Sequence, residues 1–102
     1  MAKLIALYKH PEDTALFDRY YFEKHVPLAK TIPGLRRYEV STGPVATPQG
    51  ISQFHLIAEL TFDSFAAIQA ALTSPEGIAA GNDLGNFAGA GVDLLVFDSK
   101  EV

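Results

Sequence analysis

The first and last predicted strands of this 102-residue chain are apolar at consecutive positions, and this feature constrains the fold most strongly. Successive side chains of a strand point to opposite faces. The runs 3–9 and 92–98 therefore carry apolar side chains on both faces. Large apolar surfaces usually mark an interface. The sequence predicts a sheet that is covered by helices on one face and by another partner on the opposite face.

The segment after the first strand has the spacing of a helix. Asp13 or Thr14 can cap it, and Phe17, Tyr21 and His25 follow at intervals of four residues. Pro27 cannot donate the hydrogen bond that continues a helix, so we expect a break or kink before a second short helical turn. The segment is expected to end at Pro33-Gly34.

The second half of the chain repeats the pattern of strand and helix. Strands are expected at 35–42 and 54–62, separated by a loop at 43–52 that is rich in proline and glycine. Alternation in the second of these strands puts Phe54, Leu56, Ala58, Leu60 and Phe62 on one face and His55, Ile57, Glu59 and Thr61 on the other. An alanine-rich helix at 65–72, capped by Asp63 or Ser64, and a short helix restarted at Ser74-Pro75 come next. A glycine-rich connection is expected before the last strand.

The order is thus βαββαβ, which is the α+β ferredoxin-like arrangement of two helices on one face of a four-stranded antiparallel sheet. We expect a single domain over residues 1–102. Two helices can cover only one face of the sheet. The open apolar face is therefore expected to meet the same face of a second copy, related by two-fold symmetry.

The composition excludes several classes of function. There is no cysteine, so a disulfide, a thiolate metal site and a thiol nucleophile are impossible. The net charge of −4 argues against nucleic acid as a partner. No apolar run is long enough to span a membrane, and the N-terminus does not resemble a signal peptide, so we expect a soluble cytoplasmic protein. The three histidines lack the spacing of a metal site.

Several short motifs, in order along the chain, resemble the EthD family, which is named for ethyl tert-butyl ether degradation. They are the first strand with Pro11, the row ending in His25-Val26-Pro27-Leu28, Pro33-Gly34-Leu35, Ser74-Pro75-Glu76-Gly77, and Asp83-Leu84 with Asn86-Phe87. The resemblance covers the chain apart from the 43–52 loop. It implies a dimeric α/β barrel, in which two ferredoxin-like sheets close on each other. The wider superfamily includes cofactor-free monooxygenases, lactone isomerases, polyketide-modifying enzymes and haem-binding enzymes.

His25 is the foremost candidate for a catalytic residue. Histidine has an unperturbed pKa near physiological pH and can act as a general acid or base. Tyr21, one turn earlier, and Asp83 could orient it or contact substrate. Alternatively, His25 is a structural residue whose ring binds a carbonyl group freed before Pro27, and Asp83 belongs to a helix end or turn.

The remaining candidates concern substrate binding. An aromatic cleft could include Tyr8, Phe17 and Phe87, with Arg36 and Asn86 as polar contacts, although aromatic residues at helical spacing more often belong to a core. His55 is expected to be solvated or at an interface, and His10 to be exposed in a turn. Glu59 and Asp93 lie inside strands, where we expect structural ion pairs with Arg36, Arg37 or Lys3.

Two functions remain open on the sequence. The first is a cofactor-independent enzyme that acts on a small apolar cyclic or aromatic carbonyl compound by proton transfer or oxygenation, with His25 moving the proton. The second is a non-catalytic protein that binds a hydrophobic metabolite or supports an oxidising enzyme system. A haem-binding protein with His25 as axial ligand is a weaker third alternative.

Overall fold

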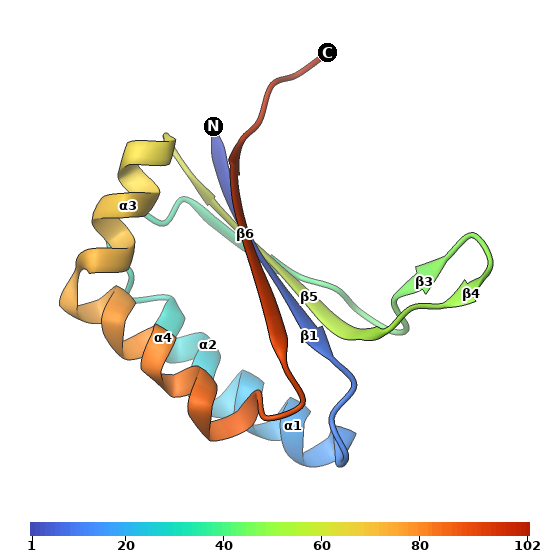
Figure 1. Ribbon diagram of the computed structural model, residues 1–102. Coiled ribbons are helices and arrows are strands. Elements are labelled where there is room, and N and C mark those ends of the chain that lie inside the picture. The colour runs from blue at the N-terminus through green and yellow to red at the C-terminus, as the bar shows by residue number, and fades with distance from the viewer.

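The computed structural model describes all residues from 1 to 102. One four-stranded antiparallel sheet has the strand order β2-β5-β1-β6, and every helix lies on the same side of it (Figure 1). The elements are β1 (Ala2–Lys9), α1 (Thr14–Tyr20), η1 (Tyr21–His25), α2 (Val26–Ala29), β2 (Arg37–Val40), β3 (Ala46–Thr47), β4 (Gly50–Ile51), β5 (Phe54–Phe62), α3 (Phe65–Thr73), α4 (Pro75–Phe87) and β6 (Val92–Asp98). The predicted α+β ferredoxin-like fold is confirmed.

The hydrophobic core lies between the sheet and the helices. The central strands β1 and β5 pair Leu4 with Leu60 and Ala6 with Ala58, and these side chains are buried. Phe17, Tyr21 and Ile68 reach them from the helices. Every second residue of β1 and of most of β5 is thus buried, and these residues lie on the face that the helices cover.

The helix that contains His25 does not break at Pro27. It widens into a π-helical turn, η1, in which the Val26 N–H bonds to the Tyr21 carbonyl, and it continues as α2 with Pro27 in the first turn. In an α-helix a step of four residues overshoots one turn. A π-turn holds more residues, so the same step falls slightly short of one turn and offsets the drift of the preceding α-helical turn, which keeps Phe17, Tyr21 and His25 on the buried face. Such turns occur frequently at functional sites.

The segment after Ser74 is more helical than expected. Helix α4 runs to Phe87, through the glycine-rich stretch that was expected to be a connection. Ser74 accepts a hydrogen bond from the Gly77 N–H and thereby caps the helix, and Pro75 stands in the first turn. As a result Asp83, Asn86 and Phe87 lie on a helix and not in a turn.

His55 does not lie on the face of the sheet that the alternation predicted. A β-bulge shifts the pairing between β1 and β5, so that Tyr8 pairs with Leu56 but Lys9 pairs with Phe54. His55 is the extra residue, and its ring contacts Asp18 and Phe17 on the helix side. A bulge adds one residue to a strand and changes the direction of its side chains. It therefore interrupts the alternation that had placed His55 on the open face of the sheet.

The opposite face of the sheet carries no helix. It presents Ile5, Leu7 and Ile57, together with Leu95 and Phe97, which are 54% and 42% exposed. Among the polar residues there, Lys3 pairs with Glu59 at 3.0 Å, as one of the expected ion pairs. The short β3–β4 hairpin, within the predicted loop, projects beside the sheet (Figure 1). None of the helices has the length and apolar character needed to cross a membrane.

Candidate active site

An apolar cavity of about 80 Å³ lies between the sheet and the helices. Tyr8 from β1, Tyr38 from β2, and Tyr21 and His25 from η1 supply its polar groups. Most of the other lining residues are apolar, among them Leu4, Ala6, Ala29, Ile32, Ala58, Leu60 and Leu84. One buried water needs roughly 10–15 Å³ of such volume, so the cavity holds a molecule of about the size of a small ring.

His25 and Asp83 form a buried pair beside this cavity. His25 Nδ1 lies 2.9 Å from Asp83 Oδ2, and the two residues are 6% and 9% exposed. A carboxylate can only accept hydrogen bonds, so Nδ1 carries the proton and donates it. In this orientation the neutral form of the ring has its lone pair on Nε2. The pair has the arrangement of an oriented imidazole base.

Asp83 is held by three donors. Tyr20 Oη donates to Oδ1 at 2.6 Å, and Asn86 Nδ2 donates to the same oxygen at 2.9 Å. Burial raises the pKa of Asp83, but the hydrogen bonds from Tyr20, Asn86 and His25 together outweigh it and hold that pKa below its usual value. Asp83 is therefore an anion at neutral pH.

Two polar atoms of the lining have no partner within the chain. They are His25 Nε2 and Tyr8 Oη, and neither makes a hydrogen bond. Because no fully buried polar side-chain atom lacks a partner, both atoms must touch accessible space. Burial, followed by the effect of Tyr38 and Asp83, raises the pKa of Tyr8. Tyr8 thus offers a neutral O–H donor, while His25 offers an acceptor.

Tyr21 and Tyr38 close the sheet side of the cavity. Their hydroxyl groups share a hydrogen bond of 2.6 Å, and Tyr21 is fully buried. Burial is the first cause that raises the pKa of each phenol. The ring of Tyr21 lies 5.4 Å from the ring of His25 and 5.5 Å from that of Tyr8, measured between centroids. Tyr21 therefore helps to fix both groups with free polar atoms.

The cavity opens between α3, α4 and β6. Leu72 and Leu94 line it, yet they are 44% and 52% exposed, so they form its rim. Gly81 of α4 is also exposed, and a side chain placed there would meet no atom within 4 Å. A ligand can thus enter past small and apolar side chains.

The other predicted substrate-binding residues lie outside this cavity. Phe17 and Phe87 pack behind Tyr8, and Phe87 also lies against His25 with 4.7 Å between ring centroids. Asn86 does not line the cavity but donates a hydrogen bond to Asp83. Arg36 lies on the surface, away from this cavity, and binds both carboxylate oxygens of Asp63 at 2.8 and 3.1 Å.

The site contains two further residues, of which Tyr20 was considered only for the aromatic cleft and Tyr38 was not a candidate. Tyr20 contacts Asp83, and Tyr38 contacts Tyr21 from a different strand. Tyr20 stands next to a residue that was predicted, but its partner is 63 positions away along the chain. One feature could have identified Tyr38: it alternates with exposed residues in the short strand β2, and it pairs with the buried Leu60 of β5.

The comparisons with known proteins agree with this architecture. The model of the EthD domain matches residues 9–91. The chain belongs to the EthD family. An uncharacterized 11.0 kDa protein from the thcB–thcC intergenic region of Rhodococcus erythropolis is 38% identical over 102 residues, which cover all of this chain and 98% of that protein. A crystal structure of an EthD family protein from Bacillus halodurans is 42% identical, with a TM-score of 0.90 and coverage of 98% and 99% of the two chains.

More distant structures share the fold alone. A dimeric ferredoxin-like protein of unknown function from Bacteroides fragilis is 21% identical, with a TM-score of 0.65 and coverage of 96% and 95%. A hydroxynitrile lyase from Passiflora edulis is 14% identical, with a TM-score of 0.75 and coverage of 99% and 94%. Proteins with this fold are thus found as dimers, and at least one of them is an enzyme.

Proposed function

We propose that this EthD-family protein is a cofactor-independent enzyme that moves a proton on a small cyclic or aromatic carbonyl compound. The observation that carries the proposal is the His25–Asp83 pair, 2.9 Å apart, at the edge of an apolar cavity. The pair resembles the oriented bases of other enzymes, in which a carboxylate fixes the tautomer of a histidine.

The proposed step uses the two unpartnered atoms of the cavity. His25 Nε2 accepts a proton from the carbon next to the carbonyl group, and Asp83 stabilises the imidazolium that forms. The negative charge moves to the carbonyl oxygen, which accepts a hydrogen bond from Tyr8 Oη. The imidazolium then returns its proton to carbon, either at the same position or at another one, so no oxidant and no cofactor is consumed.

The cavity supports a substrate that is small and mostly apolar. Its volume of about 80 Å³ is well below the roughly 300–1,000 Å³ of pockets for drug-sized ligands and cofactors. Haem at His25 therefore does not fit this cavity. Water is scarce in an apolar cavity, which strengthens electrostatic interactions within it.

A binding protein without catalysis is the second candidate. The apolar lining favours it, because such a lining would hold a hydrophobic metabolite without any chemical step. It predicts that a bound compound seen by native mass spectrometry stays unchanged during prolonged incubation.

Deuterium uptake separates these two candidates without knowledge of the natural substrate. Small cyclic ketones, with cyclopentanone as the first probe, are incubated with the protein in D2O, and deuterium next to the carbonyl group is followed by NMR. The enzyme candidate predicts uptake above the buffer rate with the wild type and the Lys24→Gln variant, an exposed control. The His25→Gln variant should lose it. A ketone that binds without any uptake would favour the binding protein.

We also propose that the protein forms a homodimer through the open face of its sheet. The apolar residues Ile5, Leu95 and Phe97 on that face support a partner of the same kind, because exposed apolar patches usually mark interfaces. Closure of two such sheets would give a barrel with a site in each protomer.

A further inference from the structure

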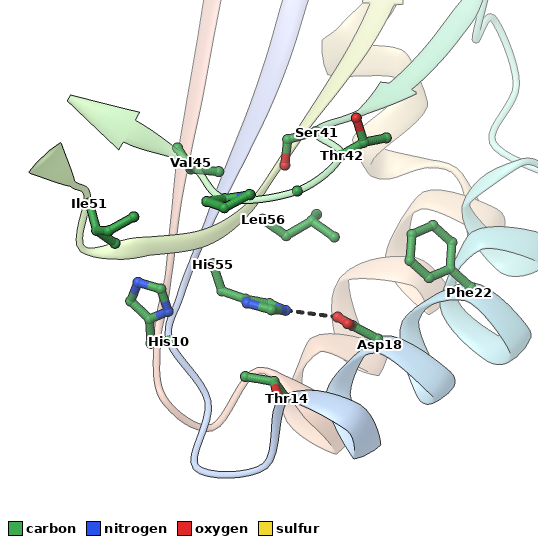
Figure 2. A pocket seen from close by; sticks show the side chains of 12 residues that line it. His10, Thr14, Asp18, Phe22, Ser41, Thr42, Val45, Ile51, His55 and Leu56 are labelled. Carbon is green, nitrogen blue, oxygen red and sulfur yellow. Dashed lines mark hydrogen bonds and ion pairs between the residues drawn. The ribbon is translucent and has the colours of Figure 1, made fainter. Parts of the chain in front are cut away.

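A second hollow, which we call the His55 cleft, shares no residue with the cavity at His25. It has a volume of about 580 Å³ and lies between α1, the segment that follows β2, and the start of β5. Figure 2 shows the side chains that turn toward it from these elements. The lining residues that matter for binding include His10, Asp18, Phe22, Ser41, Thr42 and His55.

The cleft contains the second histidine–carboxylate pair of the molecule. His55 Nε2 lies 2.7 Å from Asp18 Oδ1, and Figure 2 shows the two side chains meeting across the cleft. Since the carboxylate accepts, Nε2 donates and the other ring nitrogen, Nδ1, is free. Nδ1 has no partner in the chain, and no fully buried polar side-chain atom is left without one. It is therefore accessible to a ligand.

Other polar groups of the cleft are also uncommitted. Ser41 Oγ accepts a hydrogen bond from the Ile57 N–H at 2.9 Å, which leaves its O–H to donate. The hydroxyl groups of Thr14 and Thr42 make no hydrogen bond within the chain. His10 uses Nε2 to bind the Ser52 carbonyl at 2.9 Å, so its Nδ1 is free.

The walls and the charge of the cleft narrow the choice of ligand. Phe22, Val45 and Ile51 supply apolar surface, and the lining contains no lysine or arginine. A phosphate or another multiply charged anion would lack the fixed positive charges that usually bind it. Asp18 balances the charge of an imidazolium at His55, so a carboxylate would be held there by hydrogen bonds from the ring N–H and the hydroxyl groups and not by a net positive charge.

We propose that the His55 cleft binds a small carboxylic acid with an apolar body, outside the His25 cavity. The acid gives its proton to His55 Nδ1, which yields an imidazolium held between Asp18 and the new carboxylate. The carboxylate accepts hydrogen bonds from Ser41 and Thr42, and its apolar body packs against Phe22 and Ile51. No bond other than the O–H bond of the acid breaks.

Benzoate is the probe that tests this proposal on the full chain. Calorimetric titration should give saturable binding, and NMR signals of residues 41–45 and 55 should shift. Binding should weaken as pH rises above the range in which imidazole titrates, because the complex holds one proton more than free protein and benzoate. The titratable groups that face the cleft are His10, Asp18 and His55.

Two variants locate the site. His55→Gln keeps a side-chain N–H for Asp18 but removes the base, and it should weaken benzoate binding by about tenfold or more, as expected for a hydrogen bond to a charged group. Thr42→Val, at an exposed position, should weaken it less. The proposal is overturned if benzoate does not bind, if binding is indifferent to pH, or if it is lost in His25→Gln and retained in His55→Gln.

Discussion

His25 and His55 are matched in chemistry but differ in what surrounds their free nitrogen. Each donates one ring N–H to an aspartate, at 2.9 and 2.7 Å. His25 turns its free nitrogen to an apolar cavity, whereas the His55 cleft is larger and carries hydroxyl groups. We therefore assign proton transfer to the first residue and acid binding to the second.

The three donors around Asp83 make its charge important for stability. Asp83→Asn should lower the free energy of unfolding at pH 7 by about 1–3 kcal/mol, since it weakens buried hydrogen bonds to a charged acceptor. The pKa of Asp83 is lowered in the folded state. The charged form thus stabilises the protein above the unfolded pKa of about 4, and this contribution is lost as pH falls through the folded pKa.

Urea unfolding at pH 7 and at pH 3 measures this prediction. The difference between wild type and Asp83→Asn should shrink at the lower pH, because pH 3 lies below the unfolded pKa of about 4 and the unfolded state then gains a proton that the folded state binds less readily. The matched control is Asp63→Asn at the exposed pair with Arg36, which should have little effect at either pH. A difference for Asp83→Asn that stays constant with pH would contradict the account.

The sequence identified some site residues and missed others for a definite reason. His25 and Tyr21 were candidates because they stand in a row of helical spacing, and Asp83 was a candidate because it belongs to the motif Asp83-Leu84 with Asn86-Phe87. Tyr20 and Tyr38 were missed because their partners are distant along the chain. Arg36 lies outside the cavity, and nothing local reveals that Asp63 satisfies its guanidinium.

At the scale of elements, helix α4 depends on glycine in one place and tolerates it in another. A side chain at Gly77 would lie 2.0 Å from the Ala71 carbonyl oxygen, so α3 and α4 approach each other too closely for any other residue. A side chain at Gly85 would meet no atom within 4 Å. Close packing therefore requires glycine at position 77, whereas position 85 has room for a larger residue.

Replacement of these glycines by alanine should have opposite effects. Gly77→Ala should destabilise the protein by about 1–3 kcal/mol or more through overpacking. Gly85→Ala should stabilise it by up to about 1 kcal/mol, because alanine is the better helix former. Thermal and urea unfolding of the two variants measure both effects. Equal changes in stability, of the same sign, would show that a side chain at position 77 does not collide with the Ala71 carbonyl group.

The strands and the order of elements followed from alternation and from turn residues. Two features, helix α4 and the position of His55, differed from the prediction for reasons that local sequence patterns do not contain. Helix α4 continues through its glycines because Asp83, Leu84 and Phe87 pack against the rest of the molecule. His55 changes face because of a bulge, which is a property of the pairing between two strands and not of either strand alone.

For the molecule as a whole, we propose that the open face of the sheet is the interface of a homodimer. Leu95→Asp places a charge among the exposed apolar residues of that face, so it should separate the proposed dimer without loss of the fold. Ile78→Asp, at a similarly exposed position on α4, should leave the dimer intact. Light scattering should give twice the chain mass of 11.0 kDa for the wild type and the control. A monomeric wild type, or a dimeric Leu95→Asp variant, would contradict this interface.

If His25 moves protons on a ligand in the apolar cavity, its replacement should slow the exchange of protons next to a carbonyl group. The most direct test is the rate of deuterium uptake by cyclopentanone in D2O, compared between the wild type and His25→Gln. A general base usually contributes about 10²–10⁴-fold to a rate, so the enzyme-dependent rate should fall by at least about 100-fold in the variant. Equal rates for the two proteins, with both folded and dimeric, would contradict the account.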